Sequence, residues 1–229
     1  GYLVAAALVS VTASSLGMVS SVPLARNLLT PARTSRHVVS ASIVSFAAVA
    51  AAAGVFALVG DRIVQAALGP AYAGDVGDEI GRLVVLLGPW MATSIGVTIT
   101  FPILFVAGRG GRLPLLAVAA LALHVAVVWA LVRAFDLDGA AIALAVSTLA
   151  VLVALLLLLS PRVFAEAARG LALGALVIGG LALAAYAAAG TLLPAVLAAV
   201  LGSAAFAVLL LATSRLGLRQ AWSYLRALE

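Results

Sequence analysis

The sequence contains no cysteine, only two histidines, and charged residues at just 9% of its positions. Without cysteine the chain has neither disulfides nor thiolate metal ligands. No apolar run carries a pair of carboxylates, so a metal-dependent hydrolase or a Ser/His/Asp triad lacks most of its parts. We therefore expect no catalytic residues, no metal site and no cofactor, and a protein that is not an enzyme.

Lysine is absent as well, because all thirteen basic residues are arginine. These arginines are spread one to three per loop and form no concentrated basic patch of the kind that binds nucleic acid. The turn from Gly108 to Arg112 superficially suggests a phosphate loop, but it lacks the Lys-Ser/Thr ending and follows no strand. Neither nucleic acid nor a nucleotide is an expected partner.

Apolar residues are abundant instead, at 66% of the chain, with a mean hydropathy of +1.28. A soluble domain carries charge on about a quarter of its residues. Several charge-free runs are long enough to cross a hydrocarbon core of about 30 Å. The sequence thus predicts an all-α integral membrane protein, a bundle of seven transmembrane helices over residues 1–214 with spans at about 2–22, 38–60, 83–107, 113–132, 139–159, 171–189 and 194–214.

The arginines also predict an orientation, because cytoplasmic loops are enriched in basic residues. Ten arginines fall on the side assigned to the cytoplasm, and they are Arg26, Arg33, Arg36, Arg109, Arg112, Arg162, Arg169, Arg215, Arg219 and Arg226. Three fall outside, Arg62, Arg82 and Arg133, together with six of the eight acidic residues. This separation predicts an external N-terminus, a cytoplasmic C-terminus and a basic interfacial tail over 215–229.

The third span is bounded by charge of opposite sign, with Asp75 and Asp78 before it and the Gly108–Arg112 turn after it. Pro89 and Pro102 within it each remove a helical hydrogen bond, so both are candidate hinges. The preceding segment, 62–82, is too short and too interrupted by glycine and proline to span. We expect an interfacial helical turn and an external loop there.

Small polar residues recur along the first span. They are Ser10, Ser14, Gly17 and Ser21, whose spacing of i, i+4, i+7 and i+11 places them on one helical face. Such a face has two readings that the sequence leaves open, namely close helix packing or the wall of a water-filled substrate cavity. Ser94 and Thr98 repeat the pattern in part in the third span, where packing is slightly favoured.

His124 lies in the middle of the fourth span, where an ionisable residue raises a functional hypothesis. Its helical neighbours are apolar, which favours a neutral, hydrogen-bonded structural histidine over a cavity residue. Gly170 and Gly174, at small-xxx-small spacing in the sixth span, indicate a helix-packing face that Ala175 and Gly179 extend.

A basic rim is expected at the cytoplasmic lip of the second span, formed by Arg26, Arg33, Arg36 and His37. Topology and contact with lipid headgroups account for these charges, and recruitment of a phosphate-bearing substrate is the alternative. The chain begins at Gly1 with a charge-free run and no basic n-region, which argues against a signal peptide. We read it as part of a longer protein.

Four segments carry a family resemblance: VPLARN, ALGPAYAGD, FPILFVAGRGGRLPL and DLDGAAIALAVST. In this order and spacing, over residues 22–159, they resemble the C-terminal half of the oligosaccharidyl-lipid and polysaccharide flippases of the MOP superfamily. The resemblance implies one lobe of a two-lobed transporter of the bacterial inner membrane. Its partners would be the missing N-terminal lobe, membrane lipids and a polyprenyl-pyrophosphate-linked glycan, and the first span would line the cavity.

Other functions compete with this one. A lipid II flippase is the second branch of the same superfamily, and seven C-terminal spans ending inside would also fit the second half of such a fourteen-helix protein. That branch carries key cavity arginines in its N-terminal half and at the start of the helix that corresponds to the first span. Neither region is present here, and the first span as it stands contains no arginine. A membrane-embedded polyprenyl-dependent glycosyltransferase would need surface carboxylates, for which the candidates are Asp61, Asp75, Asp78 and Asp136. A scaffolding membrane protein is a third reading. The driving ion and the identity of the glycan are not encoded in any recognisable motif.

Overall fold

The computed structural model describes residue 6 and residues 31–213. Every regular element in that part of the chain is helical. The elements are α2 (Pro31–Leu68), η1 (Pro70–Tyr72), α3 (Asp75–Leu86), α4 (Gly88–Val106), η2 (Gly110–Arg112), α5 (Leu113–Leu159), α6 (Pro161–Leu192) and α7 (Ala195–Ala212). The first predicted span and the tail over 215–229 lie outside the described residues.

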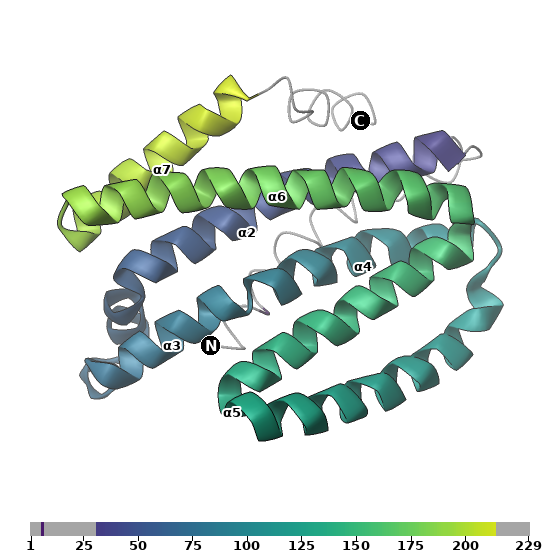
Figure 1. The fold of residues 1–229 in the computed structure, drawn as a ribbon, viewed down its shortest axis with the longest axis horizontal. Coiled ribbons are helices and arrows are strands. Elements are labelled where there is room, and N and C mark those ends of the chain that lie inside the picture. The colour runs from purple at the N-terminus through teal and green to yellow at the C-terminus, as the bar shows by residue number, and fades with distance from the viewer. Residues whose placement is uncertain (1–5, 7–30, 214–229) are drawn as a thin grey trace.

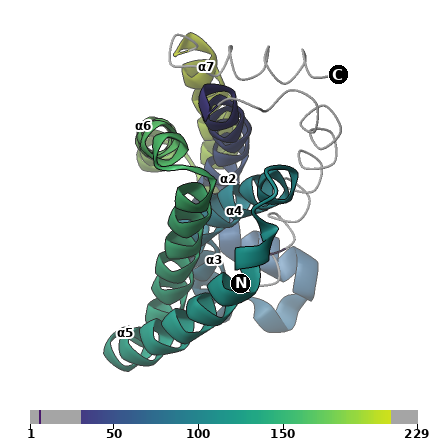
Figure 2. The same ribbon diagram turned by 90° about the vertical axis from the view of Figure 1, so that its right-hand side faces the viewer.

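The expected helical architecture is confirmed, and five of the described helices are long and apolar enough to cross a membrane, which is compatible with a multi-pass membrane protein. Helix α2 is central, because it packs against α3, α4, α6 and α7. The α5 hairpin and α7 lie at opposite edges of the bundle (Figures 1 and 2). Large apolar side chains such as Leu176 remain 72% exposed on its outside, as expected where lipid replaces water as the solvent.

Helix α2 is longer than the span expected at 38–60, since it begins at Pro31 and ends at Leu68. It kinks at Val59, whose φ of −137° and ψ of 21° are not helical, so the kink marks the place where the span was expected to end. Beyond it, Gly60 and Gly81 bring α2 and α3 into backbone contact, with 2.9 Å from the position of a Gly60 Cβ to the Gly81 Cα. Only glycine permits this approach.

The third span, expected as one helix over 83–107, consists of two helices that meet at Leu87. Pro89 lies in the first turn of α4, a favoured position for proline, and the break between α3 and α4 at Leu87 falls two residues before it. Helix α4 continues through Pro102 to Val106. The segment 62–82 is mostly helical and not a loop, because the end of α2 and the start of α3 occupy it.

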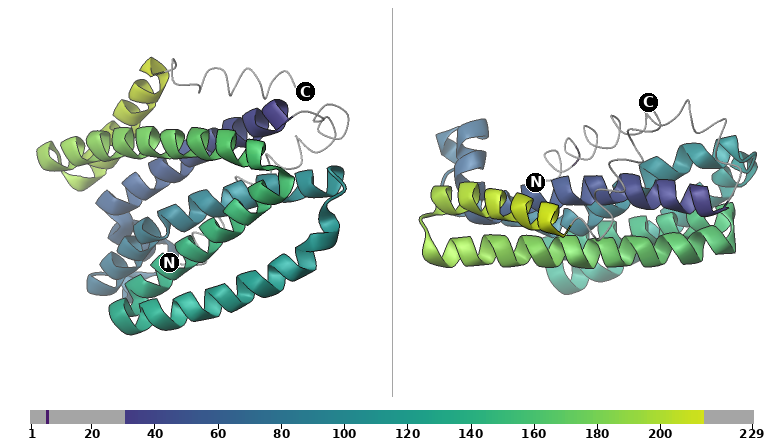
Figure 3. Two further views of the ribbon diagram at one scale, coloured as in Figure 1. Left: turned by 45° about the vertical axis from the view of Figure 1, so that its right-hand side comes forward. Right: turned by 90° about the horizontal axis from the view of Figure 1, so that it is seen from above.

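Helix α5 reverses direction at Asp136, which has φ +49° and ψ −128°. At 1.5 Å per residue a straight helix of its length would extend about 70 Å, more than twice the thickness of the hydrocarbon core of a bilayer. The two limbs run back alongside each other (Figure 3). They correspond to the spans expected at 113–132 and 139–159, and the Gly139 backbone lies so close to Leu131 that a side chain would collide with its carbonyl.

Helix α6 begins at Pro161, earlier than the span expected at 171–189, because Ser160 caps it by accepting a hydrogen bond from the Val163 amide at 3.1 Å. Gly170 and Gly174 lie against Val39 and Ile43 of α2, which confirms them as a packing face. Gly179 has no such neighbour. Helix α7 follows after Pro194 and matches the last expected span closely.

Candidate functional site

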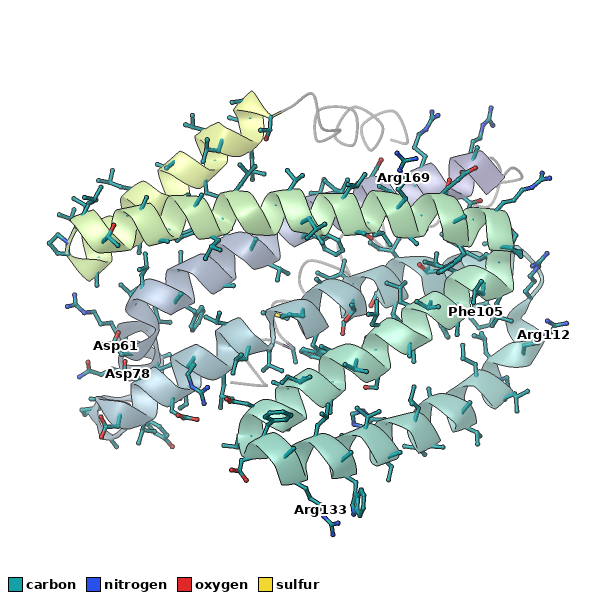
Figure 4. The ribbon with its side chains drawn as sticks, in the orientation of Figure 1. Asp61, Asp78, Phe105, Arg112, Arg133 and Arg169 are labelled. Carbon is teal, nitrogen blue, oxygen red and sulfur yellow. The ribbon has the colours of Figure 1, made fainter. Side chains whose placement is uncertain are left out.

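Charged residues are sorted between the two ends of the bundle. Arg112 and Arg169 lie at one end and Asp61 and Asp78 at the other (Figure 4). The turn of α5 belongs to the acidic end, because Asp138 in this turn contacts Arg82 of α3 at 2.8 Å. The described arginines that the sequence assigns to the cytoplasm thus share the end at which α2, α5 and α6 begin.

The basic rim is only partly on the surface. Arg33 and Arg36 are exposed in the first turns of α2, whereas His37 is fully buried at 0% exposure and does not form part of an accessible rim. Next to it, Ser35 donates a hydrogen bond of 2.6 Å to the Glu166 carboxylate of α6. His37 lies about 100° from Arg36 around the helix but only about 40° from Arg33, so helical periodicity alone does not explain the difference. His37 is buried because it lies at the edge of the α2 face that packs into the bundle, beside the buried Thr34 and Val38. Arg26 lies outside the described residues.

The turn between α4 and α5 forms a basic pocket at this same end. Gly108 adopts a left-handed φ of +70°, which glycine tolerates without steric cost, and this conformation reverses the chain. The Arg109 Nη1 donates to the carbonyls of Leu158 and Leu159, at 2.6 and 2.5 Å. These are unsatisfied acceptors at the C-terminus of α5, where a cation is favoured. The pocket has a volume of about 480 Å³ and is lined by Gly108, Arg109, Gly111, Arg112 and Leu158.

The acidic end holds a small ion-pair network. Arg82 contacts Glu79 at 3.1 Å on its own helix and Asp138 at 2.8 Å on α5. Hydrogen bonds to Asp138 and then to Glu79 raise the pKa of the Arg82 guanidinium above its ordinary value. Arg82 also lines a cavity of about 300 Å³ with Asp61 and Asp78, between α2 and α3. Asp75 is exposed in the first turn of α3.

A face of α4 carries both candidate hydroxyls of the third span. Ser94, Thr98, Phe101 and Phe105 follow at i, i+4, i+7 and i+11 and therefore line one face. Ser94 is half-buried, and the other three are exposed. The Thr98 hydroxyl donates to the Ser94 carbonyl at 2.9 Å, so its lone pairs remain available to accept a hydrogen bond. This face is polar at mid-helix and aromatic toward the basic end, where Phe101 and Phe105 stack edge to face at 5.3 Å.

His124 has the hydrogen-bond partner that a structural histidine requires. Its Nδ1 lies 2.8 Å from the Ser147 Oγ on the other limb of α5. Ser147 also contacts the Ala143 carbonyl at 2.7 Å, so His124 joins the two limbs through a satisfied hydroxyl. The imidazole ring is half-buried.

A set of polar residues in α2 escaped the sequence reasoning. They are nearly or fully buried and comprise Thr34, Ser35, Ser40, Ser42 and Ser45. Ser45 donates to the Ala41 carbonyl at 3.2 Å, and the Ser42 Oγ has no hydrogen-bond partner among the described residues. The signal was present in the run HVVSASIVSF, where serine recurs every two or three residues within an apolar helix.

The remaining candidates of the first span, Ser10, Ser14, Gly17 and Ser21, lie outside the described residues. Within residues 31–213 no three His, Asp or Glu side chains gather where they could hold a metal ion. Comparisons of the chain with known protein families, with curated proteins and with solved structures give no match.

Proposed function

We propose that this chain is one lobe of a flippase of the bacterial inner membrane, with seven crossings, an external N-terminus and a cytoplasmic C-terminus. It translocates a polyprenyl-pyrophosphate-linked oligosaccharide or cell-wall precursor by alternating access, together with an N-terminal lobe of the same protein. Four motifs in family order over residues 22–159 support this proposal, as does the sorting of charge to opposite ends of an apolar bundle.

The observation that carries the proposal is the α4 face of Ser94 and Thr98. Polar groups in a membrane helix ordinarily face the protein interior or a water-filled cavity. Thr98 is exposed although it lies in the middle of α4, and its hydroxyl oxygen retains accepting capacity for a sugar or water hydroxyl. We infer that this face lines the path of the glycan, and that the two lobes rock against each other around it.

Replacement of Thr98 by leucine in the full-length protein tests this proposal. Thr98→Leu removes the acceptor while keeping a helix-forming residue, so export of the glycan should fall about threefold for one lost hydrogen bond. Accumulation of the polyprenyl-linked precursor on the cytoplasmic leaflet is the measurement, with protein abundance checked by immunoblot.

Thr191→Leu is the matched control. Thr191 is exposed and donates a hydrogen bond to its own helix, to the Ala188 carbonyl at 3.0 Å, but it lies in the last turn of α6, away from the α4 face. It should leave export unchanged. Normal export by Thr98→Leu at normal abundance would remove the α4 face from the transport path and leave the proposal without its main support.

A further inference from the structure

We propose that the pocket in the α4–α5 turn binds the phosphate of an anionic phospholipid. The pocket is the one lined by Gly108, Arg109, Gly111, Arg112 and Leu158. This site is separate from the α4 face of Ser94 and Thr98, and the inference does not depend on transport.

The size and shape of the pocket suit a lipid headgroup. Its volume of about 480 Å³ falls within the range of small-molecule sites, about 300–1,000 Å³. It lies in the turn between α4 and α5, at the end of the bundle that Arg112 and Arg169 mark (Figure 4). Basic pockets between helix ends on the cytoplasmic side are the usual form of a phospholipid headgroup site.

The two arginines supply preorganised donors. Arg109 is held by the Leu158 and Leu159 carbonyls through Nη1 alone, so its guanidinium is fixed while Nε and Nη2 make no hydrogen bond within the described residues. Arg112 is exposed, and no acidic side chain of the described chain contacts either arginine. A fixed guanidinium beside a second, uncompensated one favours a phosphate, which accepts two parallel N–H bonds from arginine.

Apolar side chains beside the pocket distinguish a lipid from free phosphate. Phe105, whose ring lies against Gly110 in the same turn, is 58% exposed. Leu115 and Val118 in the first turns of α5 are 74% and 67% exposed. Acyl chains descending from a phosphate in the pocket would cover these side chains, whereas inorganic phosphate would leave them bare.

Lipid titration of the purified full chain tests the inference. The chain is delipidated in a neutral detergent and titrated with phosphatidylglycerol or phosphatidylcholine, and bound lipid is counted by native mass spectrometry. Arg112→Gln should weaken phosphatidylglycerol binding about fivefold, because each arginine near an anionic surface contributes on the order of 1 kcal/mol. Binding of phosphatidylcholine should not change.

Two further variants distinguish binding of the lipid in the pocket from attraction by the net positive charge of the protein. Arg133→Gln removes another exposed arginine, which stacks on Trp129 near the α5 turn, 4.0 Å from the ring centroid, and should leave phosphatidylglycerol binding unchanged. Gly111→Leu keeps both arginines and fills the pocket, and an added Cβ there meets no atom within 4 Å. It should weaken binding as Arg112→Gln does.

Three results would overturn the inference. Equal losses from Arg112→Gln and Arg133→Gln would show attraction by net charge alone. Unchanged binding by Gly111→Leu, with native helicity by circular dichroism, would show that the lipid does not enter the pocket. Displacement of phosphatidylglycerol by equimolar inorganic phosphate would assign the site to a free anion.

Discussion

At the scale of single residues, Tyr186 ties three helices together. From α6 its hydroxyl donates to the Ala51 carbonyl of α2 at 3.2 Å and lies 2.9 Å from the Ser203 Oγ of α7. The ring fits only because Gly54 and Gly202 have no side chains, since a Cβ at Gly54 would clash with the ring atoms and one at Gly202 would lie 2.9 Å from the ring. In lipid, where apolar burial gives little net attraction between helices, such close packing provides much of the stability.

Gly54→Ala should therefore lower the free energy of unfolding by about 1–3 kcal/mol, because the buried Tyr186 ring must shift. The measurement is the unfolding midpoint of the purified chain in mixed detergent and SDS. Gly180→Ala on α6 is the control, since nothing lies within 4 Å of an added Cβ. Alanine favours helix by up to about 1 kcal/mol over glycine, so the control should be neutral or stabilising. An unchanged midpoint for Gly54→Ala would argue against the packing of Tyr186 described above.

At the scale of elements, the reversal of α5 concentrates strain in one residue. Asp136 has a positive φ of 49°, a conformation that glycine adopts readily and other residues adopt at a cost. Asp136 is the only residue within α5 whose dihedrals are not helical, so the next residue, Leu137, already has helical dihedrals. The hairpin is then held by His124 and Ser147 between its limbs and by Asp138 against Arg82 of α3.

Substitution by glycine should have opposite effects at these two neighbours. Asp136→Gly removes the strain and should raise the free energy of unfolding by about 1 kcal/mol. Leu137→Gly places glycine in a helix and should lower it by about 1 kcal/mol. Both are measured by the same SDS unfolding assay. Destabilisation by both variants would mean that Asp136 makes an interaction outweighing its backbone strain.

At the scale of the whole molecule, the fold places opposite charge at opposite ends of an apolar bundle. Arg112 and Arg169 mark one end, and Asp61, Asp78 and the Arg82–Asp138 ion pair mark the other. This arrangement is the one expected of a bundle in a bilayer, because a charged side chain costs several kcal/mol near the centre of the hydrocarbon core. The α5 helix runs between the two ends twice, since it reverses at Asp136.

Cysteine labelling can test this arrangement in intact membranes, since the natural chain has no cysteine to interfere. Asp78→Cys and Ala134→Cys should react with an impermeant maleimide from one side, and Gly111→Cys from the other. Ile95→Cys, at 0% exposure within α4, should stay unlabelled and is the control. Labelling of positions 78 and 111 from the same side would refute the topology. Labelling of 134 and 111 from the same side would refute the second crossing of α5.

Much of this architecture follows from composition alone. The transfer of a residue from water to lipid depends mainly on that residue's own side chain, so charge-free runs identify the apolar helices and arginines identify their ends. The breaks near Val59, Asp136 and Pro194 fall close to where charge or turn residues interrupt those runs. Of the candidate site residues, Ser94, Thr98 and His124 were also visible in this way, because a polar residue stands out in an apolar run.

The tertiary structure alone determines the features that depend on contacts between two distant segments of the chain. Helix α6 extends past its apolar run because Ser160 caps its start, and the start of α2 is held against α6 by the hydrogen bond from Ser35 to Glu166. His37 is buried although its neighbours Arg33 and Arg36 are exposed, which depends on the rotation of α2 against the bundle. Arg109 bonds to a carbonyl 49 residues away, and Arg82 pairs with Asp138 across two helices. Such contacts arise from the placement of helix ends in space, which no local pattern of residues encodes.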